Sequence, residues 1–434
     1  MLIVSKFGGS SVANSKQFEK VKSIVTSNKE RQVVIVSALG KKDKDDSKIT
    51  DLLYLLHAHL LYNVPYDPIW TLIKERYNKV KSDLNLNTDL DSEFAILEKK
   101  LNKQISIDYL VSRGEYLTAK LMADYLDYTF VDAEDVVKFN YDGSVNQEQT
   151  YQLLSEVYKK SPKLIIPGFY GSYPDGNVKV FSRGGSDISG ALVSRALKAD
   201  EYENWTDVSG VLIADPRIVT NAKAIKEISY NELRELSYMG ANVLHEETVF
   251  PVQQLNIPIH IKNTNKPEDF GTIISNNCTD NTQVITGISG KKNFTSFTIT
   301  KKQNVNKTKT VMAVLKVLDK FNVNIEHMPS SIDSFSIVVN TSDVEKCLYD
   351  LVSEINKLEG VENVSVDNNI ALVAVVGRNM VTKPGISGKI FGILGSNGIN
   401  IKMIAQGSQE ISIIVGVSNA DFEKAINAIY DNIV

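Results

Sequence analysis

A lysine and a pair of glycines near the start of the chain have the residue types of a phosphate-binding turn. Lys6, Gly8 and Gly9 directly follow a short apolar run at residues 2–4, which predicts a strand that ends in a glycine turn. Glycine lets the backbone approach an anion closely, and N–H groups at a helix start bind phosphate. We expect that helix over residues 14–28, and the lysine adds a mobile positive charge. A plain strand-to-helix turn is the alternative interpretation of this segment taken alone.

Length and composition indicate a multidomain globular protein. The chain has 434 residues, so two or three domains are expected. Its 48 Lys and Arg against 52 Asp and Glu give a net charge of −4, which argues against a nucleic-acid partner. No apolar run approaches the length of a membrane span, and two cysteines in unrelated segments indicate no disulfide framework. The five scattered histidines suggest no metal site. We therefore expect a cytoplasmic protein with no membrane partner.

Apolar runs alternate with helical patterns through the first two-thirds of the chain. The runs at residues 33–36 and 164–169 end in turns rich in glycine or hydroxyl side chains. Helices are expected over residues 50–63, 68–80 and 189–199. This alternation predicts parallel strands joined by crossover helices. Because open α/β sheets bind ligands at the carboxyl ends of their strands, we expect these turns to cluster. The charged stretch at residues 41–48 is expected to be a solvated loop.

The last third of the chain contains an internal repeat at an offset of 76 positions, in which residues 317–326 match residues 393–402. Each copy has the pattern of a helix, a strand, a turn, a second strand and a second helix. A further strand precedes each copy, near residues 296–300 and 370–376. The pattern predicts two small β-α-β-β-α-β units. A structural or dimerisation appendage without a ligand is the alternative.

Seven short motifs in order, together with the duplicated tail, resemble the aspartate kinase family, which has an amino-acid-kinase fold and C-terminal ACT domains. The motifs lie at residues 6–12, 37–38, 50–53, 112–115, 181–187, 205–208 and 215–217. The resemblance covers nearly the whole chain and implies an α/β protein with a mostly parallel sheet between helices, followed by two ferredoxin-like ACT units. It implies a catalytic domain at residues 1–290 and ACT units at 305–368 and 369–434. The strand near 294–302 could instead pair with the second unit.

The reaction that the resemblance implies is transfer of the γ-phosphoryl group of ATP, bound with Mg²⁺, to the side-chain carboxylate of L-aspartate. The product would be 4-phospho-L-aspartate, in the first step of lysine, threonine and methionine biosynthesis. A carboxylate is a competent nucleophile without a general base, so the main obstacle is repulsion between two anions, on the order of several kcal/mol at close range. The protein must therefore supply positive charge and fixed N–H groups where negative charge develops.

The resemblance also implies roles for individual residues. The catalytic set is Lys6, Gly8, Gly9 and Asp187. The aspartate-binding set is Ser37, Thr50, Glu115, Phe169, Arg183 and Ser186. The nucleotide-binding set is Lys6, Gly8, Gly9, Ser10, Thr206, Asp207, Leu212, Asp215, Arg217 and Asn242. Arg183 would grip the α-carboxylate in a two-pronged contact, Glu115 would pair with the ammonium, and Asp187 would either organise Lys6 or lie near the metal. Both Arg183 and Glu115 are expected in turns that follow strands. No protein side chain is assigned as a metal ligand.

The chain departs from the family pattern on the nucleotide side. Many relatives read Gly-Ala-Lys-Val-Leu-His-Pro where this chain has Asn242 in place of the lysine and Glu246 in place of the proline. Leu212 stands where an aromatic residue often lies near adenine. These changes favour an effect on nucleotide affinity more than on phosphoryl chemistry. They also motivate one alternative, a catalytically weakened amino-acid sensor; another enzyme of the same fold with a different acceptor is a second.

The resemblance implies that the ACT pair binds an end-product amino acid and inhibits the kinase. Lysine is the preferred effector, with threonine possible alone or in combination. The implied effector-binding residues are Met312, Glu326, Ser330 and Ser331. Glu326 would pair with the effector ammonium, although a solvated strand end is the alternative for it. Lys402 stands at the equivalent position of the second unit, so the two units are not expected to bind equally. A homodimer or a dimer of dimers through the ACT units is expected.

Overall fold

The computed structural model describes residues 1–182, 184–241, 244, 246–279, 284–380, 382–407 and 411–433. The chain forms two compact units. The first comprises residues 1–211, 224–230 and 243–279, and the second comprises residues 212–223, 231–242 and 280–434. Three segments inside the expected catalytic range of residues 1–290, which are 212–223, 231–241 and 284–290, therefore belong to the second unit.

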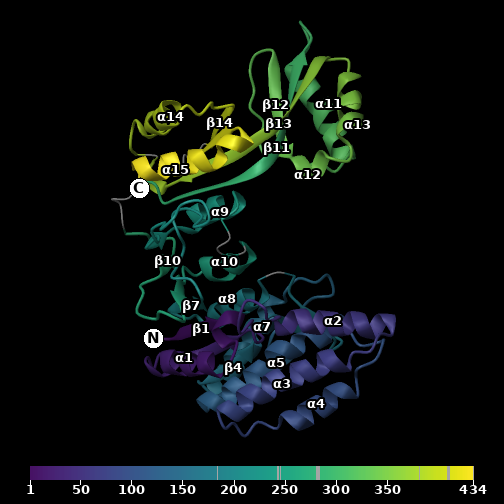
Figure 1. Cartoon of the computed structure of the whole chain (residues 1–434), viewed down its shortest axis with the longest axis vertical. Coiled ribbons are helices and arrows are strands. Elements are labelled where there is room, and N and C mark those ends of the chain that lie inside the picture. The colour runs from purple at the N-terminus through teal and green to yellow at the C-terminus, as the bar shows by residue number, and fades with distance from the viewer. Residues whose placement is uncertain are drawn as a thin grey trace. The chain divides into compact units, whose positions relative to one another are not determined.

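The first unit is built on an eight-stranded sheet with the order β3-β4-β2-β1-β7-β9-β10-β8. Figure 1 labels β1, β4, β7 and β10 of this sheet. Its strands, with the separate hairpin of β5 and β6, are β1 (Ile3–Phe7), β2 (Arg31–Val36), β3 (Thr129–Phe130), β4 (Leu164–Pro167), β5 (Tyr170–Ser172), β6 (Val178–Val180), β7 (Glu201–Thr206), β8 (Glu227–Ile228), β9 (Ile259–Asn263) and β10 (Thr272–Ile274). Every neighbouring pair in the sheet is parallel except β9 and β10. The expected mostly parallel sheet is confirmed.

Helices follow the strands in the first unit as the alternation predicted. They are α1 (Ser15–Thr26), α2 (Ile49–Tyr62), α3 (Asp67–Asp83), α4 (Leu90–Glu98), α5 (Ile107–Leu126), α6 (Ala133–Val136), α7 (Gln147–Lys160), α8 (Gly185–Leu197) and α10 (Glu246–Gln253), with the short 3-10 helix η1 (Gly9–Val12). The expected helix at 189–199 begins earlier than predicted. Gly184 adopts a left-handed conformation with φ of 58°, which glycine allows without strain, so Ser186 and Asp187 lie in the first helical turn rather than in the preceding loop.

The two faces of the sheet bury different helices. Phe7 and Trp205 belong to a hydrophobic cluster with side chains of α1, α2, α3 and α5. Their neighbours Lys6 and Asn204 contact Asp187 of α8 instead. Because successive side chains of a strand point to opposite faces, α8 covers the face opposite that cluster. Helices therefore enclose this part of the sheet on both sides, as expected.

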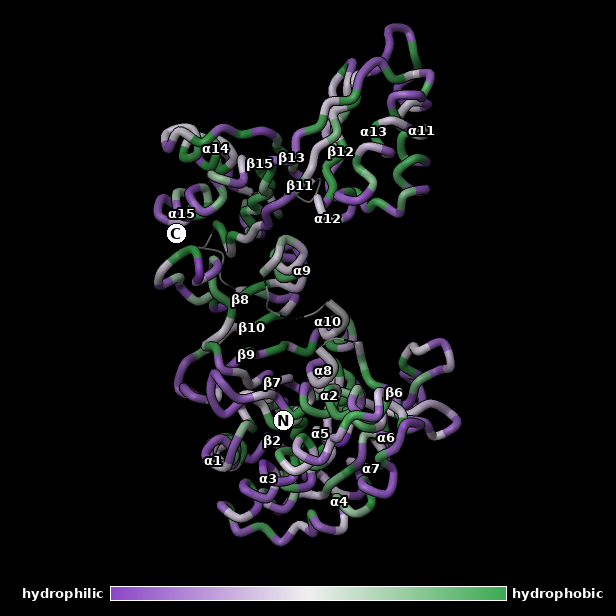
Figure 2. Tube along the Cα trace, turned by 45° about the vertical axis from the view of Figure 1, so that its right-hand side comes forward, coloured by the Kyte–Doolittle hydropathy of each residue, from purple (hydrophilic) through white to green (hydrophobic). Residues whose placement is uncertain are grey.

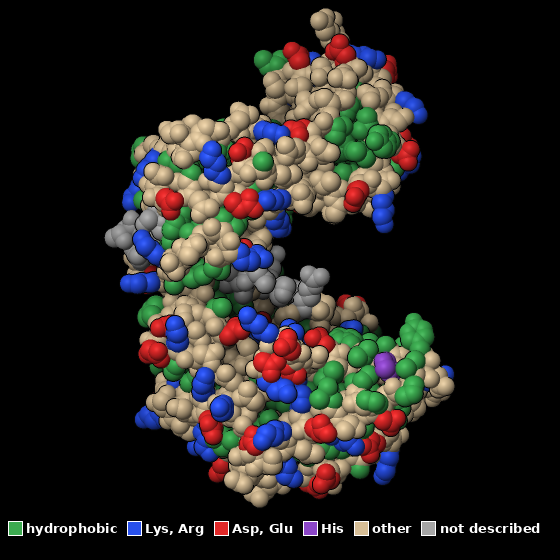
Figure 3. Space-filling view, viewed as in Figure 1, with side chains coloured by type: hydrophobic (Ala, Val, Ile, Leu, Met, Phe, Trp, Pro, Cys, Tyr) green, Lys and Arg blue, Asp and Glu red, His purple; other side chains and the backbone are tan. Residues whose placement is uncertain are grey.

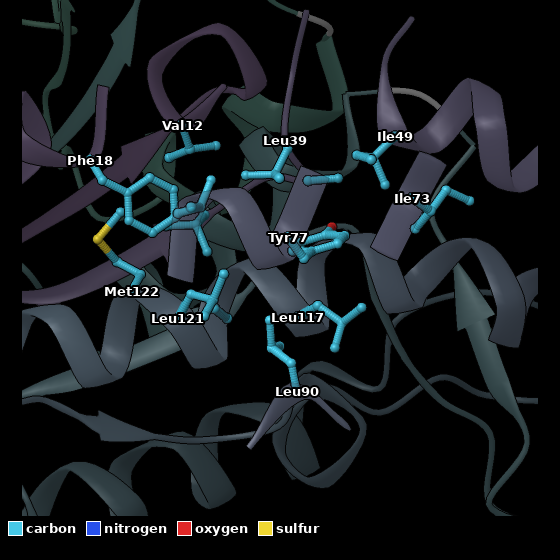
Figure 4. Close-up of a cluster of buried hydrophobic side chains, with 14 of the residues drawn as sticks. Val12, Phe18, Leu39, Ile49, Ile73, Tyr77, Leu90, Leu117, Leu121 and Met122 are labelled. Atoms are coloured by element: carbon cyan, nitrogen blue, oxygen red, sulfur yellow. The ribbon is translucent and has the colours of Figure 1, made fainter. Parts of the chain in front are cut away.

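The hydrophobic cluster of the first unit fixes both ends of the loop at residues 41–48. Leu39 and Ile49 flank that loop, and both side chains pack with Tyr77 of α3 in the buried cluster (Figure 4). The hydroxyl of Tyr77 donates to the carbonyl of Gly114 at 2.7 Å, which ties α3 to α5. Burial of such side chains contributes roughly 1.5–3 kcal/mol each. The loop therefore starts and ends at fixed points.

A buried ion pair joins three adjacent strands of the sheet. Glu203 of β7 accepts two hydrogen bonds from Arg31 of β2, at 2.8 and 2.9 Å, across the intervening strand β1. Ser5 of β1 and the indole of Trp205 donate to the same carboxylate at 2.9 Å. Burial alone would raise the pKa of Glu203, but the hydrogen bonds and charge of Arg31, together with the hydrogen bonds from Trp205 and Ser5, hold the pKa below its ordinary value. The central strands are thus locked in register around one carboxylate.

The second unit contains one continuous sheet with the order β12-β11-β13-β15-β14. Its elements are α9 (Tyr230–Tyr238), β11 (Gly287–Lys301), α11 (Lys307–Lys320), β12 (Ser334–Asn340), α12 (Thr341–Val344), α13 (Leu348–Asn356), β13 (Val361–Val376), η2 (Arg378–Met380), α14 (Ile386–Ser396), β14 (Met403–Gln406), β15 (Ser412–Val417), η3 (Asn419–Asp421) and α15 (Phe422–Ile433). The duplicated helices are confirmed, but the strands are duplicated only in part. The segment of the first copy that corresponds to β14 forms isolated bridges, His327 with Val338 and Ser330 with Phe335, and no continuous strand. The helices α11 and α13 cover one core, and α14 and α15 cover a second.

The long strands β11 and β13 run through both copies of the repeat. Residues 294–300 of β11 pair with β12 of the first copy, and residues 287–291 pair with residues 372–376 of β13, beside the second copy. Residues 294–300 therefore lie mainly beside the first copy, and the upstream half of the same strand lies beside the second.

Surface properties agree with the composition. Figure 2 shows mainly hydrophilic residues along the outer loops of the first unit and hydrophobic stretches in its interior. On the face seen in Figure 3, positive and negative side chains are interspersed. Among the described residues, no helix combines the length and the apolar character that a bilayer crossing requires. The expected cytoplasmic location stays a prediction.

Removing the buried carboxylate of Glu203 should destabilise the protein strongly. The change Glu203→Gln leaves the charge of Arg31 buried without its partner, and breaking such a pair costs roughly 3–5 kcal/mol. Urea unfolding should show this loss. The control Lys79→Ala breaks an exposed pair with Asp83 and should cost about 1 kcal/mol or less. Equal losses in the two variants would contradict this account of the sheet.

Candidate active site

The carboxyl ends of four parallel strands meet at one edge of the first unit's sheet. Phe7 pairs in register with Val36 and Trp205, and Val36 pairs with Pro167. The segments at these four strand ends are the two glycines after β1, the turn at residues 37–40, the turn at 168–169, and Thr206, which ends β7, with Asp207 after it. The predicted clustering of these turns is confirmed.

The glycine turn after β1 lies against the turn after β2. The backbone N–H of Gly40 donates to the carbonyl of Gly9 at 2.9 Å, and that of Ser37 donates to the carbonyl of Phe7 at 3.1 Å. A Cβ at Gly40 would lie 2.4 Å from the Gly9 carbonyl, so no larger residue fits there. Ser10 follows within η1, whose first residue is Gly9. The two turns form one continuous backbone surface with N–H groups beside Lys6.

Lys6 lies in a buried polar cluster at this edge. Its Nζ contacts Asp187 Oδ1 at 2.5 Å and donates to Asn204 Oδ1 at 3.3 Å. Asn204 Nδ2 donates to the same oxygen of Asp187 at 2.9 Å. The side chain of Lys6 is 9% exposed and that of Asp187 is 20% exposed. The position supports the first of the two roles left open for Asp187, which is to organise Lys6.

Glu115 lies in the middle of α5. The sequence had suggested a turn after a strand, and that expectation is wrong. The helix is continuous because Ser106 caps its start and residues 107–126 keep a buried apolar face. Burial raises the pKa of Glu115 to about 8, although a hydrogen bond from the Ala38 N–H and the charge of Arg113 act in the opposite direction. Its Oε2 atom is buried without a hydrogen-bond partner. A buried carboxyl with an unused acceptor suits a cationic ligand.

The remaining aspartate-binding candidates adjoin the same turns. Gly168 packs directly against Ser186, since a Cβ there would lie 2.7 Å from the serine side chain. Phe169 has a φ of 80°, which is unusual for an aromatic residue, and its N–H donates to Ser189 Oγ at 3.0 Å. Thr50 follows Ile49, whose N–H donates to the carbonyl of Leu39 at 3.2 Å. The structure therefore places Phe169 in the turn after β4, and Thr50 and Ser186 in the first turns of α2 and α8, beside the turns at the same strand edge.

The nucleotide-side candidates divide between the two units. Thr206 ends β7 and Asp207 follows it in the first unit, whereas Leu212, Asp215 and Arg217 belong to the second. The guanidinium of Arg217 contacts Asp215 at 2.5 Å, and these hydrogen bonds lower the pKa of Asp215. Arg183 and Asn242 lie outside the described residues, so their roles stay predictions.

Two residues at this site were not predicted. Asn204 lies opposite Lys6 in the β1–β7 register, a signal that becomes visible only when these strands are known to be neighbours. Arg76 of α3 is buried and donates to the carbonyls of Gly40 and Ser47, both at 2.5 Å. It also pairs with Asp46 at 3.2 Å. The charged loop at 41–48 is exposed, as predicted, but this buried arginine on another helix holds both of its ends.

In the second unit, Glu326 has partners that the sequence did not suggest. Its carboxylate accepts hydrogen bonds from the Tyr238 hydroxyl at 2.5 Å and from Asn340 Nδ2 at 2.7 Å. Burial and the neighbouring carboxylate raise the pKa of Tyr238 to about 12, so its hydroxyl remains a donor. The alternative of a merely solvated strand end does not describe these contacts.

The other effector candidates lie on α11 and on the segment before β12. Met312 is an exposed residue of α11. The N–H of Ser331, which follows Ser330, already donates to the carbonyl of Ser334 at 2.8 Å. At the equivalent of Glu326 in the second copy, Lys402 donates to Asp367 and to the carbonyl of Asn369, at 2.8 and 2.7 Å. The two copies therefore differ in charge and in pairing, as expected.

Comparisons with known proteins agree along the whole chain. The model of the amino acid kinase family matches residues 1–263, and an ACT domain model matches residues 373–433. Aspartokinase 3 of Bacillus subtilis is 35% identical over 442 residues, which cover 98% of this chain and 97% of that protein.

Solved structures give the same result. The crystal structure of aspartate kinase from Clostridium acetobutylicum has a TM-score of 0.93 and 46% identity, covering 100% of both chains. Two structures of Escherichia coli aspartokinase III, one with aspartate and ADP and one with lysine and aspartate, have TM-scores of 0.75 and 0.74 at 26% identity. Each of these two matches covers 100% of this chain and 99% of the E. coli chain. The chain therefore belongs to the amino acid kinase family and, within it, to the aspartokinases.

Proposed function

We propose that this protein transfers the γ-phosphoryl group of ATP to the side-chain carboxylate of L-aspartate. The observation that carries the proposal is a buried cation and a buried carboxyl group on two sides of one pair of turns. Lys6 adjoins the glycine turn after β1, and Glu115 accepts from Ala38 in the turn after β2. The ammonium of aspartate can pair with the carboxyl group of Glu115, and the transferring phosphate needs the positive charge of Lys6. The E. coli relative solved with aspartate and ADP supports this assignment.

Charge compensation is the main task of this site. Phosphate and carboxylate repel each other at contact by about 4 kcal/mol at the effective dielectric constant of a protein surface. The ammonium of Lys6 and the N–H groups of the glycine turn would offset that repulsion where negative charge develops. Arg183 would hold the α-carboxylate of aspartate and so fix the angle of attack.

ATP would bind as its Mg²⁺ complex. Among the described residues, no group of three His, Cys, Asp or Glu side chains is arranged to hold a metal ion. Mg²⁺ bound with a nucleotide needs only one or two carboxylates, because phosphate oxygens and water supply its other ligands. The metal would neutralise part of the phosphate charge when bound, and Asp187 is the carboxylate nearest to Lys6.

A coupled assay of ADP release tests the proposal. L-Aspartate should support ADP release, and L-glutamate, one methylene longer, should give a kcat/KM at least about tenfold lower. Lys6→Met should lower kcat by about 100-fold or more, since the loss of one charge-stabilising donor typically costs that much. Lys22→Met, a change on α1 in the same unit, should leave kcat within about twofold.

Three outcomes would contradict the proposal in different ways. ADP release with glutamate or another acceptor, but not with aspartate, would indicate a different enzyme of this fold. Binding of lysine without ADP release from any acceptor would indicate an amino-acid sensor. Full activity of Lys6→Met would contradict the proposed role of Lys6 and of the glycine turn beside it.

Aspartate binding should release a proton from Glu115. Because the pKa of Glu115 is about 8 when no ligand is bound, its carboxyl group is mostly protonated at pH 7. A bound ammonium favours the carboxylate and lowers that pKa, so up to about one proton per site should leave. Calorimetric titrations with aspartate at pH 7, in two buffers of different ionisation enthalpy, measure the number of protons released. Glu115→Gln removes the titrating group and serves as the control. A heat of binding that is independent of the buffer would contradict the pairing.

We propose that the ACT unit binds lysine as an inhibitor, with threonine as the second candidate. The E. coli relative solved with lysine supports this assignment. Glu326 would accept the effector ammonium in place of the Tyr238 hydroxyl, since a charged donor binds a carboxylate more strongly than a neutral one. Lys402 repels an ammonium at the equivalent position, so one site per chain is proposed. Association of chains through the ACT units, as a homodimer or a dimer of dimers, remains part of the proposal.

The effector site is tested by titrating lysine and threonine separately into the full chain. Wild type should bind lysine, and Glu326→Gln should weaken that binding about tenfold or more because a charge-assisted hydrogen bond contributes roughly 1.5–3 kcal/mol. Asp333→Asn removes an exposed carboxylate near the same segment and should leave the affinity unchanged. The absence of heat from lysine at millimolar concentration would contradict lysine as the effector.

A further inference from the structure

Asn204 contacts both members of the buried ion pair at the proposed active site. It lies opposite Lys6 across the parallel strands β1 and β7 and is 4% exposed. Its Nδ2–H donates to Asp187 Oδ1 at 2.9 Å, and its Oδ1 accepts from Lys6 Nζ at 3.3 Å. Both polar ends of one neutral side chain are therefore engaged with the two charged groups.

These contacts define where the ammonium of Lys6 can donate. An ammonium has three N–H bonds, and two of those of Lys6 have fixed acceptors on Asp187 and Asn204. A Cβ at Gly8 would lie 3.5 Å from Lys6 Nζ, which places the ammonium directly beside the glycine turn. The remaining N–H is then available to a phosphate oxygen at that turn.

The same amide stabilises Asp187 when the lysine is shared with a ligand. A phosphate competes with Asp187 for Lys6, and a partly buried carboxylate that loses a donor is destabilised. The hydrogen bond from Asn204 reaches the same oxygen that Lys6 contacts, so that oxygen keeps a donor while the ammonium turns toward the phosphate.

We propose that Asn204 is a positioning residue, which orients the ammonium of Lys6 toward the transferring phosphoryl group and stabilises Asp187 as Lys6 engages the phosphate. The inference rests on the proposed phosphoryl transfer and adds a residue to it. The competing account is that the amide only completes the hydrogen bonding of the core.

The first test compares Asn204→Leu with a matched control. Leucine keeps the volume and removes both hydrogen bonds, so kcat for aspartate-dependent ADP release should fall about tenfold or more. The affinity for ATP, measured by calorimetry without an acceptor, should fall about threefold or more. His260→Leu removes another buried side chain with two hydrogen bonds, on β9 at 2.7 and 2.6 Å. It should leave kcat and ATP affinity within about twofold.

The second test uses pH and the variant Asn204→Asp. The ionised form of the new carboxyl adds an anion beside Asp187 and holds Lys6 back from the phosphate. Its protonated form has the shape of the amide and restores one donor and one acceptor. The kcat of this variant relative to wild type should therefore rise as the pH falls from 8 to 5.5. Thermal unfolding at each pH shows whether the folded fraction changes.

The outcomes separate this inference from the proposed function. If wild type releases ADP with aspartate and folded Asn204→Leu equals it in kcat and ATP affinity, the positioning role is wrong and the proposed function stands. If wild type releases no ADP, the proposed function fails, and the ATP affinities alone decide: equal values contradict the positioning role, and weaker binding to Asn204→Leu supports it. If Asn204→Leu does not fold, the pH profile of Asn204→Asp decides, and a profile parallel to that of wild type contradicts the inference.

Discussion

The contact between Lys6 and Asp187 is the constraint on which the proposed chemistry depends. A cation that is 9% exposed would be strongly destabilised alone, so the fold can keep Lys6 beside the glycine turn only by giving it an anionic partner. That partner also competes with any phosphate for the lysine. The site must therefore hold the pair firmly enough to fold and loosely enough to bind a nucleotide. A neutral amide that touches both groups is one physical solution.

The sheet brings the residues that meet this constraint together at one place. Lys6 comes from β1, Asn204 from β7 and Asp187 from the first turn of α8. The two strands are locked to each other and to β2 by the buried carboxylate of Glu203. Since residues near the carboxyl ends of parallel strands point in fixed alternation, a stable register places the charged side chains without help from flexible loops. Stability of the central strands and geometry of the site therefore have the same cause.

The sequence predicted the parallel sheet, the duplicated tail and most turn residues, because strand-end glycines and hydrophobic periodicity are local signals. It could not place Glu115 correctly, since a carboxyl in the middle of a helix carries no local mark of the turn it packs against. Asn204 and Arg76 were missed for a related reason. Their partners are 17 residues or more away along the chain, so only the tertiary arrangement identifies them. The same holds for Tyr238, which contacts Glu326 from a segment 88 positions away.

A crystal structure of the protein with L-aspartate and a non-hydrolysable ATP analogue tests most directly whether Lys6 contacts the transferring phosphate. We expect Lys6 Nζ at hydrogen-bond distance, about 3 Å, from an oxygen of the terminal phosphate, with the guanidinium of Arg183 on the α-carboxylate of the bound aspartate. A terminal phosphate bound away from the glycine turn, with Lys6 still held only by Asp187 and Asn204, would contradict this expectation.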